Sequence, residues 1–265
     1  MEKIFKGKNL WAIILGGSSG FGFATGKKLA HHGMNICIIH RNRKSEIIEI
    51  QKNFNGIISE KIKFLSFNED AILPEKRIRI ISELKKKIPA KGKVRVLVHS
   101  IAKGNLKPML SEDKPTLKND DFHLTIEAMG ISLYDWTKDL FENNLFTSDA
   151  RIISFTSEGN KKAWKNYAAV SASKAVLESI TRNIALEFAQ FGIRANCIQA
   201  GITDTSSFRM IPGNKKLKEY ALIRNPFKRL TTPEDVANAV YLLCLDEAAW
   251  INGTVIPVNG GEHLS

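Results

Sequence analysis

The sequence places a lysine and a tyrosine on the apolar face of a predicted helix. Within 163–190, apolar residues such as Leu177 and Ile180 recur every three or four positions, a spacing typical of the buried face of a helix. The same face extends back through Lys174 to Tyr167. The seven-residue spacing is almost two turns, so the two side chains should share one face, about 10 Å apart along the axis. A lysine directed into a core needs polar partners or loses its proton.

Two interpretations of this pair are open at this point. In the functional one, Lys174 binds the ribose hydroxyls of a nicotinamide nucleotide, and its charge lowers the pKa of Tyr167 below the usual value near 10. In the structural one, a lysine extends its charged end to solvent beside a core tyrosine. A dinucleotide site at the same edge of the sheet would favour the functional interpretation.

A glycine-rich turn after the first apolar run predicts such a site. The stretch "LGGSSGFGFATGKKLA" carries Gly16, Gly20 and Gly22 in the spacing G-x-x-x-G-x-G and leads into a predicted helix. Glycines permit positive φ and close backbone approach, and the helix N-terminus offers free N–H groups to a pyrophosphate. Ser18 and Ser19 add hydroxyl donors. A tight turn with no ligand is the alternative.

Basic residues after the second apolar run favour a phosphorylated cofactor. The stretch "IIHRNR" has no acidic residue to bind a ribose 2′-hydroxyl, whereas Arg41, with Arg43 nearby, can bind a 2′-phosphate. We therefore expect NADPH, with NADH less favoured; solvated loop arginines are the alternative. Asn68 and Glu69 follow the third run, where an adenine edge can be hydrogen-bonded.

The elements that would position these residues alternate along the chain. Apolar runs predict strands at 10–15, 35–40, 61–65, 94–100, 150–155, 193–198 and 254–258. Longer periodic segments predict helices at 20–32, 43–54, 74–88, 119–142, 163–190 and 232–245. This alternation predicts one α/β domain over 1–265, a doubly wound parallel seven-stranded sheet (Rossmann fold) flanked by helices. The segment 201–231 is too long for a simple connection and is expected to be a substrate-binding lid.

The bulk composition indicates a soluble protein. The chain has 265 residues, 43% of them apolar, and no run approaches the length of a membrane span. Its N-terminal apolar run ends in glycines, so we expect a strand and no signal peptide. Cys37, Cys197 and Cys244 are predicted to be buried free thiols, which favours the cytoplasm. The net charge of +12 reflects either a general lysine bias or an acidic partner.

Several motifs together resemble the short-chain dehydrogenase/reductase superfamily over essentially the whole chain. They are the glycine turn, the Tyr…Lys helix, "PFKRLTTPEDVA" and the closing "VNGG". Most members have the tyrosine four residues before the lysine, where this chain has Val170. The seven-residue separation, "VHSIAKG" and "QAGITDT" resemble the enoyl-acyl-carrier-protein reductases of type II fatty-acid synthesis. The glycine spacing is closest to their NADPH-dependent type III members.

The resemblance implies roles for residues across the chain. Tyr167 and Lys174 would be catalytic, with Ser157 in support, and Gly104 with Tyr167 would contact the substrate. The implied cofactor-binding residues are Gly16, Ser18, Ser19, Gly20, Phe21, Gly22, Arg41, Asn68, Glu69, Ser100, Ile101, Lys174, Ile202, Thr203 and Thr205. Two positions depart from related patterns. Ser157 stands where the branch often has a second tyrosine, and Met129 stands where many ketone reductases have a relay asparagine.

The displaced tyrosine has a chemical rationale. A ketone reductase delivers hydride to the carbon that bears the oxygen, so its acid lies beside the hydride. An enoyl thioester accepts hydride at C3 while negative charge develops on the more distant thioester oxygen. A donor one turn further along the helix, such as Tyr167, then meets the enolate oxygen, a role worth a few kcal/mol.

The resemblance also implies partners. An acidic acyl carrier protein bearing the enoyl thioester would dock on a basic cluster in the lid, and the chain would form a homotetramer. The cluster consists of Lys215, Lys216, Lys218, Arg224, Lys228 and Arg229. No nucleic acid, membrane or metal ion is expected. The alternatives are a 3-oxoacyl or other carbonyl reductase and, more remotely, a non-catalytic nucleotide-sensing module.

Overall fold

The structure is a computed structural model that describes residues 3–89 and 92–264, so residues 1–2, 90–91 and 265 of the predicted domain lie outside the described part. Its strands form one parallel sheet in the order β3-β2-β1-β4-β5-β6-β7. Their bounds are β1 Leu10–Leu15, β2 Asn35–His40, β3 Phe64–Asn68, β4 Lys93–His99, β5 Phe146–Thr156, β6 Ile193–Ala200 and β7 Val255–Val258. The predicted doubly wound α/β fold is confirmed.

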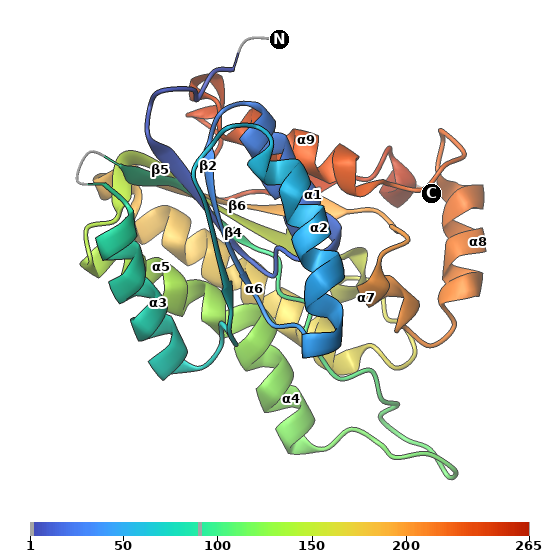
Figure 1. The fold of residues 1–265 in the computed structure, drawn as a ribbon. Coiled ribbons are helices and arrows are strands. Elements are labelled where there is room, and N and C mark those ends of the chain that lie inside the picture. The colour runs from blue at the N-terminus through green and yellow to red at the C-terminus, as the bar shows by residue number, and fades with distance from the viewer. Residues whose placement is uncertain (1–2, 90–91, 265) are drawn as a thin grey trace.

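Helices cover both faces of the sheet (Figure 1). Their bounds are α1 Gly20–His31, α2 Ile47–Ile58, α3 Pro74–Lys87, α4 Asn119–Ile126, α5 Ser132–Glu142, α6 Ala168–Glu187, α7 Ser206–Arg209, α8 Asn214–Arg224 and α9 Pro233–Leu243. α1, α2 and α9 pack on one face, and α3, α5 and α6 on the other. The strand order reverses between β1 and β4, so the carboxyl ends of these two strands flank the crevice where such sheets bind ligands.

Two apolar cores result, one on each face. Along β1, Ile13 and Leu15 point to the core under α3, α5 and α6, whereas Ala12 and Ile14 point to the core under α1, α2 and α9. Because successive side chains alternate between faces, a strand covered on both sides must be apolar throughout. This explains the unbroken apolar runs of the sequence.

The helix α2 and the strand β3 begin three to four residues later than predicted, whereas β2 occupies the predicted 35–40. A short 3-10 helix, Lys44–Glu46, precedes α2, which occupies 47–58 and not 43–54. Lys61 then adopts a φ of +59° in the turn after α2, and β3 begins at residue 64 and not 61. The left-handed residue explains the difference, since an extended strand does not accommodate it.

The predicted helix 119–142 is interrupted by a π-helical turn, Glu127–Ile131. At Gly130 in this turn an added methyl group would lie 3.0 Å from Cγ1 of Val176 on α6, so the two helices approach closely there. Single π-turns are frequent at functional sites. This one carries Met129, which lines the cavity described below.

The helix α6 begins later than predicted, and Tyr167 lies just before it. Asn166 has a φ of +63° and Tyr167 is the N-cap residue, so the predicted start at residue 163 is wrong. The carbonyl of Tyr167 accepts the N–H of Ser171 at 2.7 Å, which starts the helical hydrogen-bond pattern. Lys174 lies inside α6, but Tyr167 precedes its first residue. The predicted separation of almost two helical turns within one helix therefore does not hold for the pair.

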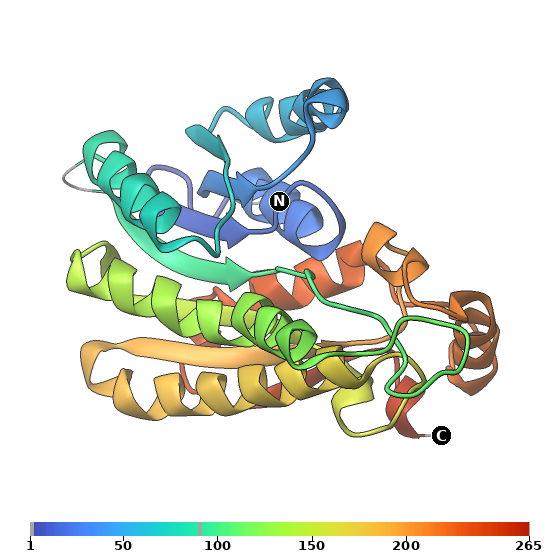
Figure 2. The same ribbon diagram turned by 90° about the horizontal axis from the view of Figure 1, so that it is seen from below.

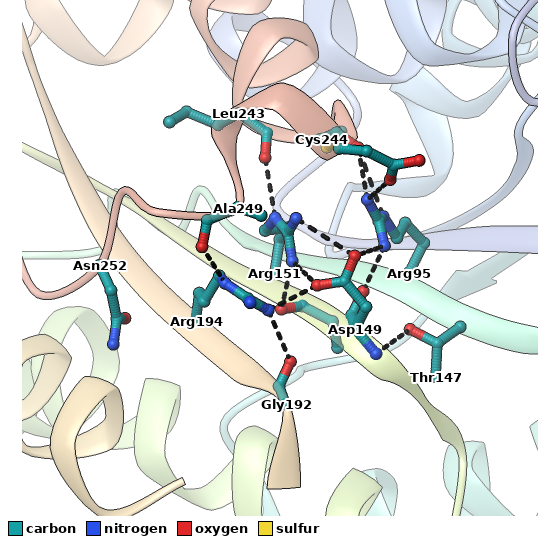
Figure 3. Close-up of polar contacts among 12 residues, drawn as sticks. Arg95, Thr147, Asp149, Arg151, Gly192, Arg194, Leu243, Cys244, Ala249 and Asn252 are labelled. Carbon is teal, nitrogen blue, oxygen red and sulfur yellow. Dashed lines mark hydrogen bonds and ion pairs between the residues drawn. The ribbon is translucent and has the colours of Figure 1, made fainter. Parts of the chain in front are cut away.

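A network of partly buried charges occupies the amino ends of β4, β5 and β6 (Figure 3). The Asp149 carboxylate accepts hydrogen bonds from the guanidinium groups of Arg95, Arg151 and Arg194. Arg95 and Arg151 also donate, at 3.0 Å, to carbonyl groups at the C-terminal end of α9. These carbonyls carry the partial negative charge of the helix end, so the arginines cap it and join α9 to the sheet.

The structure confirms that the three cysteines are buried free thiols. Burial raises the pKa of Cys197 and of Cys244 to about 12. Such thiols are inert at neutral pH, since the thiolate is the reactive form. Of the helices in the described part of the chain, none combines the length and apolar character needed to cross a bilayer.

Candidate active site

The glycine-rich turn packs against the loop after β4 and leaves no room for side chains. Gly16 has a φ of +81°, and a methyl group added there would overlap the carbonyl of Ser100. One added at Gly22 would overlap the carbonyl of Gly16. The turn therefore brings the start of α1 close to the crevice between β1 and β4. Ser19 is the N-cap residue, but its hydroxyl does not cap the helix.

A groove runs along the carboxyl ends of β1, β2 and β4. Of the predicted cofactor-binding residues, it is lined by Gly16, Ser18, Ser19, Gly20, Phe21, Arg41, Glu69, Ser100, Ile101 and Thr205. Gly22 lies behind the turn and packs on it, and Asn68 does not line the groove.

The rim of the groove contains an acidic residue that the sequence analysis missed. Asp70, just after β3, pairs with Arg41 at 2.9 Å and with Lys103 at 3.4 Å. Burial alone would raise the pKa of Asp70, but the Ile72 N–H and the charges of Lys103 and Arg41 hold it below its usual value. The expectation that no carboxylate stands near Arg41 considered only β2, whereas the sheet places the end of β3 beside it.

The two residues predicted to meet an adenine edge have partners within the protein. Asn68 accepts the N–H of Asn42 at 2.9 Å and donates to its carbonyl at 3.2 Å. Glu69 forms ion pairs with Lys76 and Arg79. Asn68 therefore fixes the loop after β2, while the Glu69 side chain is at the groove wall.

A second cavity continues from the groove along the carboxyl ends of β4, β5 and β6. The two share Phe21, Ser100, Ile101, Ala102, Thr205 and Ser207. Apolar side chains form most of its outer wall, namely Leu106, Met129, Trp164, Val170, Phe208 and Ile211. Predicted residues that also line it are Gly104, Ser157, Tyr167, Lys174, Ile202 and Thr203. The structure thus brings the tyrosine, the lysine and the glycine turn to one continuous cavity.

Tyr167 is held in a closely packed position. Its ring lies 5.0 Å from that of Trp164, and only 7% of the residue is exposed. A methyl group added at Gly159 would lie 2.6 Å from Cε1 of Tyr167, so the ring rests on that glycine. Burial raises the pKa of Tyr167, and a hydrogen bond with Ser157 acts in the opposite direction. The prediction that Lys174 lowers this pKa is wrong in the structure, because desolvation of the phenolate outweighs other effects.

Lys174 is buried at the base of the same cavity. Its Nζ donates to the carbonyl of Phe155 at 2.7 Å. Burial lowers the pKa of Lys174 to about 8, and the side chains of Cys197 and Glu178 act in the opposite direction. The lysine does not extend to solvent, so the structural interpretation of a solvated lysine is excluded.

Two positions at which ketone-reducing relatives are expected to have polar residues are apolar in this chain. Val170, four residues before Lys174, is buried and lines the cavity. Met129, which lies in the π-turn, also lines the cavity. A methyl group added at Gly104 would lie 2.8 Å from Cγ2 of Thr125 and 3.0 Å from both Met129 Sδ and Val170 Cγ2. A carbonyl carbon placed beside Val170 would find no hydroxyl donor from that residue.

The segment 201–231 folds over the cavity as α7 and α8. Figure 2 shows it, in orange, at the same end of the molecule as the green loop after β4, and residues of both line the cavity. Arg224, at the end of α8, pairs with Glu158 at 2.8 Å and with Glu262 at 3.1 Å. Glu262 also accepts the N–H of Ile202 at 3.1 Å. This arginine joins the lid to the loops that carry Ser157 and Ile202.

The predicted basic cluster of the lid is partly neutralised. Arg224 is buried between its two carboxylates, Lys218 pairs with Asp204, and Arg229 pairs with Asp235. Lys228 donates to a backbone carbonyl. Lys215 and Lys216 are exposed and have no ion pair within residues 3–89 and 92–264. The cluster is smaller than the sequence implied because neighbouring acidic residues are brought to it.

The residues present fit a dinucleotide. The groove begins at the amino end of α1, where N–H groups suit a pyrophosphate. Side chains at Gly16 and Gly22 would close the turn that forms it. Further along, Lys174 and the hydroxyl groups of Ser157 and Tyr167 converge in a largely apolar space. This combination of a phosphate cradle and a few converging polar groups is typical of a cofactor site.

Comparisons with known proteins agree with this arrangement. Residues 16–263 match the model of the family described as enoyl-(acyl carrier protein) reductase. Protein FixR of Bradyrhizobium diazoefficiens is 28% identical over 276 residues, covering 99% of this chain and 90% of that protein. The enoyl-acyl-carrier-protein reductase (NADH) FabI of Aquifex aeolicus is 26% identical over 264 residues, covering 98% and 93%.

A solved structure shows the same fold. The Bacillus cereus enoyl-acyl carrier protein reductase, crystallised with NADP+ and an indole naphthyridinone, has a TM-score of 0.86 to this chain at 23% identity, covering 100% and 99% of the two chains. The fold, the site and the family match define an oxidoreductase of the short-chain dehydrogenase/reductase superfamily, and the chain belongs to its enoyl-acyl-carrier-protein reductase branch.

Some site residues were not found from the sequence. Asp70, Glu158 and Glu262 reach the cavity from loops whose positions depend on strand order. Glu178 had a usable signal, since it follows Lys174 by four residues and so lies on the same helix face. His99, the last residue of β4, lines the cavity as well.

Proposed function

We propose that this protein is an NADPH-dependent enoyl-acyl-carrier-protein reductase. The observation that carries the proposal is the position of Tyr167, whose phenol lies in an apolar cavity seven residues before Lys174, with Val170 in between as part of the apolar wall. In the proposed reaction, Tyr167 would act as an acid away from the residue that anchors the nicotinamide ribose, near the enolate oxygen.

The proposed cofactor contacts use groups already directed into the groove. The start of α1 and the hydroxyls of Ser18 and Ser19 would hold the pyrophosphate. Lys174 would bind the nicotinamide ribose, and Arg41 the 2′-phosphate, exchanging part of its pairing with Asp70. When bound, NADPH supplies a hydride to C3 of the enoyl thioester.

Tyr167 would donate a hydrogen bond to the thioester oxygen. Its raised pKa supports this role, because the phenol stays protonated at neutral pH and can stabilise charge as it develops. Ser157, bonded to the phenol, would hold its orientation. The apolar side chains Leu106, Phe208 and Ile211 would receive the acyl chain and exclude water.

The proposal includes an acyl carrier protein as donor of the substrate. The exposed Lys215 and Lys216 on α8 lie on the segment that covers the cavity, so they would meet an acidic carrier near the entrance. A homotetrameric assembly and a cytoplasmic location belong to the same proposal. Three free buried thiols support a reducing compartment.

A 3-oxoacyl or other carbonyl reductase is the second candidate. The hydrogen bond between the Ser157 and Tyr167 hydroxyls favours it, since two adjacent donors can polarise one carbonyl.

The test is NADPH oxidation with a panel of thioesters. We expect turnover with crotonyl thioester and none with acetoacetyl thioester. The reverse result would establish the second candidate, and no turnover with any substrate would favour a nucleotide-sensing module.

A further inference from the structure

Glu178 is a buried carboxylate behind the lining of the active-site cavity, and the proposed function gives it no role. It lies on α6 four residues after Lys174, and only 6% of the residue is exposed. Residues at this spacing are neighbours on a helix face. A buried carboxylate is costly unless it is hydrogen-bonded or faces a positive charge.

The contacts of Glu178 tie the active-site strand to the helix. Its Oε1 accepts the hydroxyl of Thr156 at 2.7 Å and the side-chain amide of Asn160 at 2.5 Å. Thr156 lines the cavity and precedes Ser157. Both donors therefore reach one oxygen. Lys174 donates to the carbonyl of Phe155, the residue before Thr156, so the lysine and the carboxylate contact neighbouring residues of β5.

Two other carboxylates, Glu158 and Glu262, line the same cavity, but both pair with Arg224 of the lid and neither is among the groups that act on Lys174. The remaining titratable groups that act on Lys174 or share its cavity are uncharged at neutral pH. On β4, burial lowers the pKa of His99 to about 3, so the imidazole is neutral. On β6, burial raises the pKa of Cys197 to about 12, so its thiol cannot supply the negative charge that would favour an ammonium. Tyr167, before α6, is a protonated phenol because burial raises its pKa.

On α6 itself, Arg182 lies a further turn along. It acts on the Cys197 thiol and is not among the groups that act on Lys174. Glu178 lies one turn along the same helix and is bonded to the residue of β5 that follows the lysine's own partner, so its carboxylate is the negative charge that acts on Lys174.

We propose that Glu178 is a positioning residue that keeps Lys174 an ammonium inside the cavity and so sets the pH range over which the protein holds the nicotinamide ribose. The second half of this statement rests on the proposed function, in which Lys174 binds that ribose. The first half concerns two side chains of this chain and is independent of any substrate. A carboxylate within about 4–6 Å of a lysine raises its pKa by one or more units.

Substitution by glutamine isolates the charge. Glu178→Gln keeps an oxygen able to accept from Thr156 and Asn160, and removes only the negative charge. Asn160→Ala is the matched control, because it removes one of these hydrogen bonds and leaves the charge. Glu187→Gln removes an exposed carboxylate from the same helix and controls for general electrostatics.

The experiment is an NMR titration of Lys174 in protein labelled with 13C-lysine, with the signal assigned by its loss in Lys174→Arg. We expect Glu178→Gln to move the midpoint to lower pH by about 1, and Asn160→Ala and Glu187→Gln to leave it in place. A folded Glu178→Gln protein with an unchanged midpoint overturns the proposal. Glu178→Met removes the charge with similar volume, and its midpoint decides the question if the glutamine variant does not fold.

Fluorescence titration of NADPH between pH 6 and 10 tests whether Glu178 sets the pH range of cofactor binding. We expect the pH at which binding weakens to move with the Lys174 midpoint in Glu178→Gln, and Glu178→Asp to restore most of it. Binding that weakens at the same pH in both proteins would overturn the role in cofactor retention. A protein that binds no NADPH at any pH would contradict the proposed function, whereas the NMR result would still decide the charge coupling.

Discussion

The two ends of the sheet treat buried positive charge in opposite ways. At the amino ends, Arg95, Arg151 and Arg194 share the carboxylate of Asp149 and the carbonyl groups around the end of α9 (Figure 3). At the carboxyl ends, Lys174 donates one hydrogen bond within the described residues, to a backbone carbonyl, and faces an open cavity. The first arrangement satisfies its charges within the protein, and the second leaves donors available to a ligand.

The difference indicates a structural role for the charges at the amino ends of the strands and a binding role for the lysine at their carboxyl ends. A guanidinium with several fixed partners holds elements together, and here it joins β4, β5 and β6 to α9. A lysine with a pKa lowered to about 8 has lost solvent and gained few partners. Such a group costs stability and is typical of a functional site.

Asp149→Asn should cause the largest loss of stability. It leaves three arginines, two of them buried, without their shared negative charge. The Asp149 side chain is itself 35% exposed, and the loss of its hydrogen bonds to charged groups should cost about 3 kcal/mol. Urea unfolding measures the free energy. Asp246→Asn removes an exposed partner of Arg95 and should change it by less than about 0.5 kcal/mol. Equal losses in the two variants would refute the central place of Asp149.

Tyr167→Phe should lower kcat by about a hundredfold, because it removes the donor to the enolate oxygen, an effect of about 2.7 kcal/mol. NADPH affinity and the free energy of unfolding should hardly change. Steady-state kinetics and urea unfolding measure the two quantities. Full activity in this variant would show that the phenol takes no part in the reaction.

Lys174→Met should weaken NADPH binding at pH 7 by about tenfold or more, since a charged hydrogen bond contributes about 1.5–3 kcal/mol. In the wild type, the ammonium is present below a pKa of about 8 and lost above it, so affinity should fall as pH rises through that value. Titration of NADPH at several pH values measures this. Affinity that is flat up to pH 10 would contradict the assignment.

Arg41→Ala should have the smallest effect, confined to cofactor choice. Arg41 is largely exposed and pairs with Asp70, so its loss should cost less than about 1 kcal/mol of stability. The ratio of kcat/KM for NADPH to that for NADH should fall about tenfold, or about 1.4 kcal/mol. Asp70→Asn is the matched variant and should raise the ratio. A ratio that changes in neither variant would exclude a 2′-phosphate contact at this rim.

Much of the fold could be predicted from the sequence because it depends on local patterns. Apolar runs between periodic helices fix a parallel sheet, and the glycines of the turn fix its first connection. The start of α6 and the later start of β3 depend on left-handed residues, Asn166 and Lys61. Asparagine adopts this conformation more often than most residues, but its presence alone does not predict it. The π-turn depends on the approach of α6 to Gly130.

The candidate site was predictable where its residues share one helix or one turn. Tyr167, Lys174 and the glycine turn meet as expected. The pairing of Arg41 with Asp70 depends on β3 lying beside β2, which is a property of the sheet. The raised pKa of Tyr167 depends on how completely Trp164 and Gly159 enclose the ring. The spacing of residues in the sequence does not predict how deeply a side chain is buried.

The most direct test of the central claim is the fate of deuterium from NADPH labelled at the transferred position. The protein would receive equal amounts of crotonyl and acetoacetyl thioesters, and mass spectrometry and NMR would identify the labelled product. The proposed enoyl reductase would place deuterium at C3 of a butyryl thioester. Deuterium in a 3-hydroxybutyryl thioester, with the crotonyl thioester unchanged, would contradict it.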